Sequence, residues 1–177
     1  MSDRMRLREM FLSSSPERMT ALAIGGIFSV DLGDDRNRLA RYLPLEGGYL
    51  LHPLPNLYFS RDPAVTVGNS LILCSMSSPA RRREGLLMSL LTTYHPQWRD
   101  IPLLYDNRQV SMALEGGDVL ALCPRGIAVG CSQRTSVHGV DHLARRLFRL
   151  EPQYNKVLAI HIPAERAFMH LDTVMTM

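Results

Sequence analysis

Two stretches of the chain repeat the same order of hydrophobic and polar segments. Each begins with two short apolar runs, which are residues 65–67 and 70–73 in the first stretch and residues 119–123 and 127–131 in the second. Gly68-Asn69 joins the first pair of runs, and Pro124-Arg125-Gly126 joins the second pair. Apolar runs of this length with glycine-containing turns between them are typical of β-hairpins. The pattern therefore predicts one hairpin in each stretch.

A helix and a further strand follow each predicted hairpin. Residues 83–94 and 137–148 have helical periodicity, and one face of the second helix carries Val137, Val140, Ala144 and Leu147. The extended segments 102–105 and 157–162 close the two stretches. Each stretch is thus predicted to have the order strand, strand, helix, strand.

Sequence matches between the two stretches have nearly constant spacing. The matches 56 or 57 positions apart are Pro96-Gln97-Trp98 with Pro152-Gln153-Tyr154, Asp62 with Asp118, and Cys74 with Cys131. A third copy is expected to begin at Asp172, 54 positions after Asp118. Such repeats stack around an axis or along a line, because one unit cannot bury its apolar face alone. We expect an α/β fold built of ββαβ repeats of about 56 residues.

The first 50 residues do not share this repeat. Ser13-Ser14-Ser15-Pro16-Glu17 can begin a helix, because proline suits the first turn and glutamate interacts favourably with the helix dipole there. One helix is predicted, followed by a mobile polar loop over residues 31–38. The predicted division is an N-terminal helical and linker segment, residues 1–50, and an incomplete domain of about two repeats plus the start of a third, residues 51–177.

Composition and charge exclude several classes of function. Hydrophobic residues make up 46% and charged residues 21% of the chain, which is ordinary for a globular protein. The net charge of +3 is small, and the densest basic run, Arg81-Arg82-Arg83, is followed at once by Glu84, so nucleic acid is not an expected partner. No apolar stretch has the ~20 residues of a membrane span. Without an apolar N-terminal signal segment, the chain is expected to be cytoplasmic.

The three cysteines do not indicate a disulfide framework or a zinc site. Cys74, Cys123 and Cys131 are an odd number and lack the CxxC spacing. They are interpreted as small buried hydrophobic residues.

The acids at the start of each repeat are the candidates for chemistry. If the repeats superpose, Asp62, Asp118 and Asp172 converge, and converging carboxylates are stable only if they meet a cation. Guanidinium matches paired carboxylates because its N–H donors form a fork. The alternative is that each acid caps a turn or pairs with a local arginine, as Asp62 could with Arg61. His170 and Asp172 are expected on one face of a strand that begins at residue 171.

Five motifs, in the same order along the chain, resemble those of the bacterial arginine deiminases. They are LPNLYFSRDP (residues 54–63), ARRRE (80–84), LEGGDV (114–119), GCSQRT (130–135) and MHLDTVMTM (169–177). The resemblance extends from about residue 11 to residue 177. It implies a partial pseudo-five-fold αβ propeller, which agrees with the predicted repeat.

The resemblance also implies roles for seven residues. Asp62 and Asp172 match the aspartates that clamp the substrate guanidinium, His170 matches the general acid and base, and Glu115 matches the glutamate that holds this imidazole. The residues implied at the amino-acid end of the substrate are Asn56, Arg81 and Arg134, with the two arginines on its α-carboxylate. The glycines Gly116 and Gly117 are expected to allow a bend with positive φ beside the substrate.

The implied reaction converts L-arginine to L-citrulline and ammonia through a covalent cysteine adduct, without a metal or other cofactor. In the family the nucleophilic cysteine lies in a C-terminal part, and none of the three cysteines here matches its motif. The chain is therefore expected to be a central fragment that lacks the nucleophile and is inactive alone. The alternatives are a non-catalytic protein that binds arginine or another guanidino ligand, and one component of a split enzyme. Such a split enzyme would be completed by a separate C-terminal segment or by further copies of this chain in a homo-oligomer.

Overall fold

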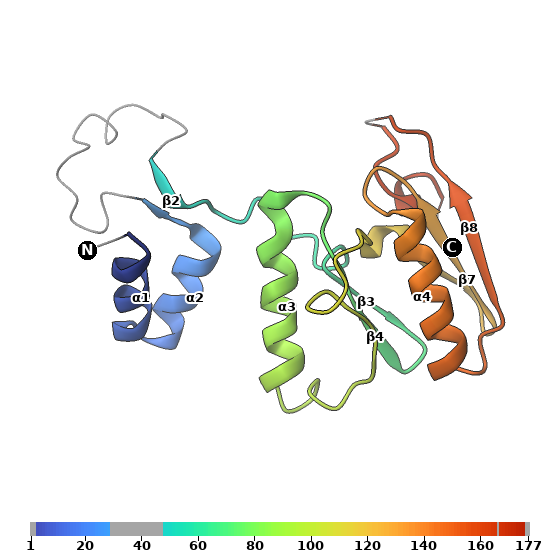
Figure 1. Ribbon diagram of the computed structural model, residues 1–177, viewed down its shortest axis with the longest axis horizontal. Helices are drawn as coiled ribbons and strands as arrows, with labels where there is room; N and C mark the ends of the chain where they lie inside the picture. Colours follow the sequence, from blue (N-terminus) through green and yellow to red (C-terminus); the bar gives the residue numbers. More distant parts are fainter. Residues whose placement is uncertain (1–2, 29–47, 166, 176–177) are drawn as a thin grey trace. The chain divides into compact units, whose positions relative to one another are not determined.

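The chain divides into two compact units, Met1–Leu57 and Tyr58–Met177 (Figure 1). The computed structural model describes residues 3–28, 48–165 and 167–175, and the polar loop predicted at residues 31–38 lies outside this part.

The first unit begins with two helices, α1 (Asp3–Ser13) and α2 (Pro16–Gly25), so the prediction of a single helix was wrong. The predicted start of α2 is confirmed, because Pro16 occupies its first turn and the Ser15 side chain accepts a hydrogen bond from the Arg18 N–H at 3.3 Å. These contacts satisfy part of the hydrogen-bonding need of the helix end.

A short antiparallel pair of strands follows, β1 (Ile27–Phe28) and β2 (Tyr49–Leu51). Gly26, between α2 and β1, has a φ of 84°. A Cβ atom there would lie 2.6 Å from the Leu51 carbonyl oxygen. Only glycine allows both this conformation and this close approach of the backbone.

The second unit contains the two predicted ββαβ repeats, which are confirmed. The first repeat consists of β3 (Ala64–Val67), β4 (Ser70–Leu73), the 3₁₀ turn η3 (Pro79–Arg81), α3 (Arg82–Tyr94) and β5 (Leu103–Asp106). The second repeat consists of η4 (Gly116–Asp118), β6 (Val119–Cys123), β7 (Gly126–Cys131), α4 (Val137–Leu150) and β8 (Lys156–His161).

The two repeats have the same sheet topology. Their three-stranded sheets have the orders β3-β4-β5 and β6-β7-β8, with an antiparallel hairpin followed by a parallel third strand. A helix, α3 or α4, connects the parallel strands in each case, as is usual for such a crossover (Figure 1). The first hairpin turns at Gly68, whose φ is 60°, a value suited to glycine.

One hydrophobic core joins the two repeats. Val140, Leu143 and Leu147 on the buried face of α4 belong to the same cluster as Ile72 of β4 and Ile127 of β7. Further contact comes from the Arg146 guanidinium, which donates hydrogen bonds to the β5 carbonyls of Leu103 and Leu104 at 2.9 and 3.3 Å. The repeats therefore fold as one unit, with α4 bridging their sheets.

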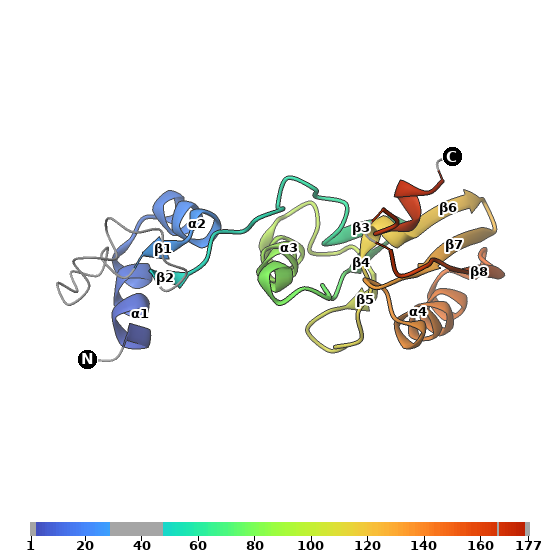
Figure 2. The ribbon, with the colours of Figure 1, turned by 90° about the horizontal axis from the view of Figure 1, so that it is seen from above.

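The C-terminal segment does not form the predicted strand. Residues Leu171–Thr173 form a 3₁₀ turn, η5, and Figure 2 shows this red segment beside β6. The Leu171 side chain packs against Leu120 and Ile162, and the Thr173 hydroxyl donates a hydrogen bond to the His170 carbonyl at 2.6 Å. Because local hydrogen bonds of hydroxyl groups compete with sheet pairing, the prediction of a strand that begins at residue 171 was wrong. In the part of the chain that the structure describes, no helix combines the length and hydrophobicity needed to cross a membrane.

Candidate active site

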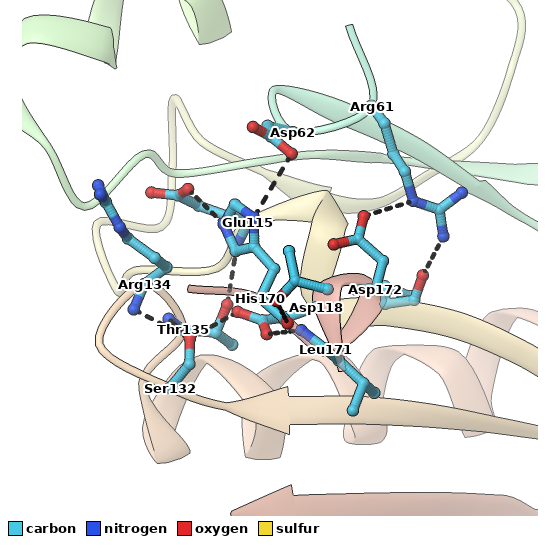
Figure 3. Close-up of polar contacts among 12 residues, drawn as sticks. Arg61, Asp62, Glu115, Asp118, Ser132, Arg134, Thr135, His170, Leu171 and Asp172 are labelled. Carbon is cyan, nitrogen blue, oxygen red and sulfur yellow. Dashed lines mark hydrogen bonds and ion pairs between the residues drawn. The ribbon is translucent and has the colours of Figure 1, made fainter. Parts of the chain in front are cut away.

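A buried ion pair between Glu115 and His170 forms the centre of the site (Figure 3). Glu115 lies immediately before η4 and is 0% exposed, while His170 lies immediately before η5. The His170 Nε2 atom is 2.9 Å from the Glu115 Oε2 atom. The structure therefore brings together two predicted site residues that are 55 positions apart in the sequence.

Two donors from Ser77 hold the other carboxylate oxygen of Glu115. Both the Ser77 N–H and the Ser77 hydroxyl donate to Glu115 Oε1 at 2.9 Å. The Glu115 N–H in turn donates to the Thr135 hydroxyl oxygen at 3.0 Å. The carboxylate and the backbone of Glu115 are thus fixed by residues from both repeats.

Asp62 lies beside the imidazole, in the turn before β3. Its Oδ1 atom is 3.8 Å from His170 Nδ1, and its carbonyl oxygen accepts a hydrogen bond from the Gly116 N–H at 2.9 Å. Asp62, Glu115 and His170 are all buried, so their mutual electrostatic interactions are weakly screened by solvent.

Gly117 leaves the space that His170 occupies. A Cβ atom at Gly117 would lie 2.7 Å from His170 Nδ1 and 3.1 Å from Asp62 Oδ1. The expectation of a positive φ at Gly116 and Gly117 was wrong, since the only described glycines with positive φ are Gly26 and Gly68. The glycine at position 117 is required by space, because any side chain would displace the imidazole.

Arg81 is buried against the carboxylates of the site. Its Nε and Nη2 atoms bind the Glu84 carboxylate at 2.8–3.1 Å, and its Nη1 atom lies 2.8 Å from Asp62 Oδ2. The same Nη1 atom is 3.9 Å from Glu115 Oε2. Asp62 therefore pairs with Arg81, in contrast to the alternative that it pairs with the neighbouring Arg61.

Asp172 and Arg134 lie at the edge of this cluster. The Asp172 carboxylate is partly exposed and is 3.7 Å from the Arg61 Nε atom (Figure 3). Arg134 is half-buried, its N–H donates to the Ser132 hydroxyl oxygen at 3.0 Å, and its guanidinium has no ion-pair partner among the described residues. Asn56 belongs to the first compact unit, so its predicted role stays a prediction.

The protonation states of the central pair follow from its surroundings. Burial alone would raise the pKa of Glu115, but hydrogen bonds from His170 and Ser77 outweigh it and lower this pKa below the ordinary value. For His170, burial alone would lower the pKa, because it disfavours the charged imidazolium. The hydrogen bond to Glu115 and the nearby charges of Asp62 and Asp118 outweigh burial, so the pKa of His170 lies above its ordinary value. Both shifts favour the charged pair, an imidazolium bound to a carboxylate.

Stability is expected to decrease as the pH rises through the His170 titration. Below the ordinary pKa of 6.5 the folded and unfolded chains are both protonated at His170, and the contribution is complete; above the raised folded pKa it is lost. We expect the free energy of unfolding to fall as the pH rises above about 6.5 and to level off above the raised folded pKa, by at most about 1.4 kcal/mol per pH unit. Urea unfolding of the wild type and His170→Gln at each pH tests this. Identical pH slopes would contradict the expectation.

Asp62, Glu115 and His170 also have donor atoms that lie within 4.8 Å of one another. A metal ion there would be repelled by the Arg81 guanidinium, which is 2.8 Å from Asp62. The expectation that no metal or cofactor is required stays a prediction.

The three cysteines differ in exposure. Cys74 is buried, Cys131 is half-buried and Cys123 is exposed, so the interpretation of all three as buried residues was wrong for Cys123. Burial, followed by the charges of Glu115 and Asp62, raises the pKa of Cys74 well above its ordinary value. Burial also raises the pKa of Cys131. Neither thiol is thus activated as a nucleophile in this structure.

Sequence reasoning missed three residues that hold the site together, namely Ser77, Glu84 and Thr135. Glu84 had a usable signal, because it lies three positions after Arg81 at the start of a predicted helix. Ser77 and Thr135 contact Glu115 across 38 and 20 positions of sequence, and serine or threonine in a loop gives no sign of such a partner.

Solved structures of low sequence identity share the fold. One is the N-terminal domain of ArgZ, a cysteine-to-serine mutant bound to substrate, an arginine dihydrolase from cyanobacteria. It has a TM-score of 0.55 and 17% identity over 68% of this chain and 41% of that chain. Another is a cysteine-to-serine mutant of DDAH from Pseudomonas aeruginosa complexed with citrulline, with a TM-score of 0.50 and 18% identity over 67% of this chain and 42% of that chain. Both likenesses indicate a mixed α/β fold of this type.

Sequence comparison identifies the family. Residues 3–177 match the arginine deiminase family. Arginine deiminases of Bacillus cereus and Listeria monocytogenes are 43% and 38% identical over 175 and 174 residues, which is 97% of this chain in both cases. The chain spans 42% of the length of these two curated relatives. The arrangement of the five motifs around a buried carboxylate–imidazole pair agrees with these matches, and the chain belongs to the arginine deiminase family.

Proposed function

We propose that the chain is the guanidinium-binding part of an arginine deiminase, an enzyme that hydrolyses L-arginine to L-citrulline and ammonia. The observation that carries the proposal is the buried pair of Glu115 and His170, 2.9 Å apart, beside the Asp62 carboxylate. Asp62, Glu84, Glu115 and Asp118 are buried carboxylates near one buried arginine and one histidine. This excess of negative charge favours a cationic ligand.

In the proposed reaction, Asp62 and Asp172 hold the substrate guanidinium while a cysteine thiolate forms a bond to its carbon. His170 donates a proton to the departing ammonia as the C–N bond breaks, which leaves an amidino group on the sulfur. His170 then takes a proton from water, whose oxygen attacks the same carbon, and cleavage of the S–C bond releases citrulline. Glu115 holds His170 in place during both proton transfers. The thiolate is proposed to come from a residue other than Cys74, Cys123 and Cys131.

Arg134, Arg81 and Asn56 are proposed to bind the amino-acid end of the substrate. Arg134 suits the α-carboxylate, since its guanidinium has no ion-pair partner in the described part of the chain. Arg81 is held by Glu84 and Asp62, so it also positions the aspartate that is proposed to clamp the guanidinium.

The two ββαβ repeats are proposed to be consecutive blades of an αβ propeller. Under this proposal residues 51–177 are an incomplete catalytic domain, with residues 1–50 as an N-terminal segment. A complementing C-terminal segment or a second copy of the chain would complete the ring. Cytoplasmic location stays a prediction.

Binding of L-arginine to the purified 177-residue chain tests the proposal by calorimetry. We expect Asp62→Asn to weaken binding at least about tenfold, because it removes one charged partner of the guanidinium. Asp100→Asn is the matched control, because the Asp100 side chain is 86% exposed and lies in the same unit. Equal affinities of the wild type and Asp62→Asn would contradict the proposal.

Citrulline formation in the same samples separates the alternatives. Arginine binding without citrulline supports a fragment or a non-catalytic guanidino-binding protein. Citrulline that disappears in Glu115→Gln would mean that a cysteine of this chain is the nucleophile. A monodisperse oligomer, measured by light scattering, would support a split enzyme completed by copies of the chain.

A further inference from the structure

Asp118 is a fully buried carboxylate that none of the proposed catalytic steps uses. It is 0% exposed and ends η4, three positions after Glu115. Its Oδ1 atom accepts a hydrogen bond from the Leu171 N–H at 2.9 Å, and its Oδ2 atom accepts one from the Ser132 hydroxyl at 2.7 Å (Figure 3). Both oxygens therefore act as acceptors, as those of an ionised carboxylate do, although burial raises the pKa of Asp118 above its ordinary value.

The hydroxyl group of Ser132 is itself oriented by the loop after β7. Its oxygen accepts hydrogen bonds from the N–H groups of Arg134 and Thr135 at 3.0 and 3.2 Å. Its single proton is thereby left to point at Asp118. The same loop holds Glu115, because the Thr135 hydroxyl accepts the Glu115 N–H.

The space for the Asp118 carboxylate depends on Gly130 of β7. A Cβ atom at Gly130 would overlap the Oδ1 atom of Asp118, the atom that accepts the Leu171 N–H. An alanine at position 130 would therefore displace the Asp118 carboxylate and disturb its hydrogen bond to the Leu171 N–H, while every charge of the site stays the same.

Leu171 directly follows His170, so the bond from its N–H to Asp118 fixes the backbone that carries the imidazole. Glu115 binds the imidazole ring at Nε2, while Asp118 binds the backbone N–H of the next residue, Leu171. A histidine that is fixed at both points has little freedom to leave the position from which it transfers protons.

The charges that face His170 are mostly negative. Asp62 lies 3.8 Å from its Nδ1 atom, and Glu115 lies 2.9 Å from its Nε2 atom. Asp118 and Asp172 are the other carboxylates that interact electrostatically with His170. Two cations lie near these acids, Arg81 beside Asp62 and Arg61 beside Asp172. Asp118 itself has no arginine as an ion-pair partner among the described residues, and its carboxylate accepts from Ser132 and Leu171 instead. Its charge contributes to the raised pKa of His170.

We propose that Asp118 is a positioning residue for His170, which fixes the backbone through the Leu171 N–H and stabilises the imidazolium by its charge. The inference deepens the proposed function, since it names what places the general acid and base in that site. It assigns Asp118 no contact with the substrate.

The test is an NMR titration of the His170 imidazole in the 177-residue chain, without arginine, in the wild type and Asp118→Asn. The asparagine keeps the shape but removes the charge, so we expect the midpoint of the His170 titration to fall by about half a pH unit or more. Asp141→Asn is the matched control, because Asp141 is exposed on α4 and pairs with Arg145. An unchanged midpoint in folded Asp118→Asn would overturn the electrostatic part of the proposal.

Gly130→Ala tests the geometric part independently, and also serves if Asp118→Asn does not fold. It should break the bond from the Leu171 N–H, which would speed hydrogen exchange of that amide at least about tenfold while distant core amides keep their protection. Protection of Leu171 equal to that of the wild type would overturn the proposal. Because arginine is absent from both measurements, their outcome is independent of whether the chain binds or converts it.

Discussion

Replacing Arg81 by methionine is expected to lower the free energy of unfolding by about 3–5 kcal/mol, because it leaves buried carboxylates without their cation. The Arg81 guanidinium binds Glu84 at 2.8 Å and Asp62 at 2.8 Å, and the Glu84 side chain is fully buried. Although burial disfavours its charge, the hydrogen bonds from Glu84 and Asp62 raise the pKa of Arg81 above its ordinary value. The guanidinium is therefore integral to the folded state of the second unit.

Urea unfolding followed by circular dichroism measures this loss. Arg82→Met is a matched control, since Arg82 is the next residue, is the first residue of α3 and is exposed. The control should change the free energy of unfolding by less than about 0.5 kcal/mol. A loss at Arg81 no greater than that at Arg82 would mean that the buried ion pairs do not stabilise the fold.

The double variant Arg81→Met, Glu84→Leu separates the charge from the packing. Replacing both members of a buried pair by apolar side chains is often neutral, whereas removing one member is costly. We therefore expect the double variant to regain part of the stability lost by Arg81→Met, but not all of it, because Asp62 still lacks its partner. An additive loss would contradict the pairing of Arg81 with Glu84.

The repeat could be predicted from the sequence because its elements are defined locally. Turn residues such as Gly68 separate short apolar runs, and the periodicity of residues 137–148 places an apolar stripe on α4. Helix α1 could not be recognised in the same way. Its apolar residues do not gather into one stripe, and Asp3–Ser13 carries charged residues through most of its length.

The site could be predicted only in part, and for a physical reason. Motif resemblance pointed to Glu115 and His170, but the residues that hold them act across the fold. The Leu171 N–H donates to Asp118 from 53 positions away, and residues 171–173 form η5 instead of the predicted strand. Single side-chain contacts of this kind leave no periodic signal in the sequence.

Replacing Glu115 by alanine is expected to cost a similar amount, about 3–5 kcal/mol, and to lower the pKa of His170. The change removes the acceptor of His170 Nε2 and leaves the Ser77 N–H without its partner inside the protein. Burial, which disfavours the imidazolium, then acts with less opposition from neighbouring charges. The loss in stability should therefore be larger below the His170 titration, where the imidazolium is formed, than above it.

Glu115→Gln distinguishes the loss of charge from the loss of a side chain. The amide oxygen can still accept from Ser77, and the amide N–H can donate to a neutral His170, so the stability lost should be smaller, about 1–3 kcal/mol. The midpoint of the His170 titration should fall in both variants, because each removes the carboxylate charge. If the midpoint fell in Glu115→Ala but stayed at the wild-type value in Glu115→Gln, the hydrogen bond alone would raise the pKa of His170. The charge of the Glu115 carboxylate would then not be what stabilises the His170 imidazolium.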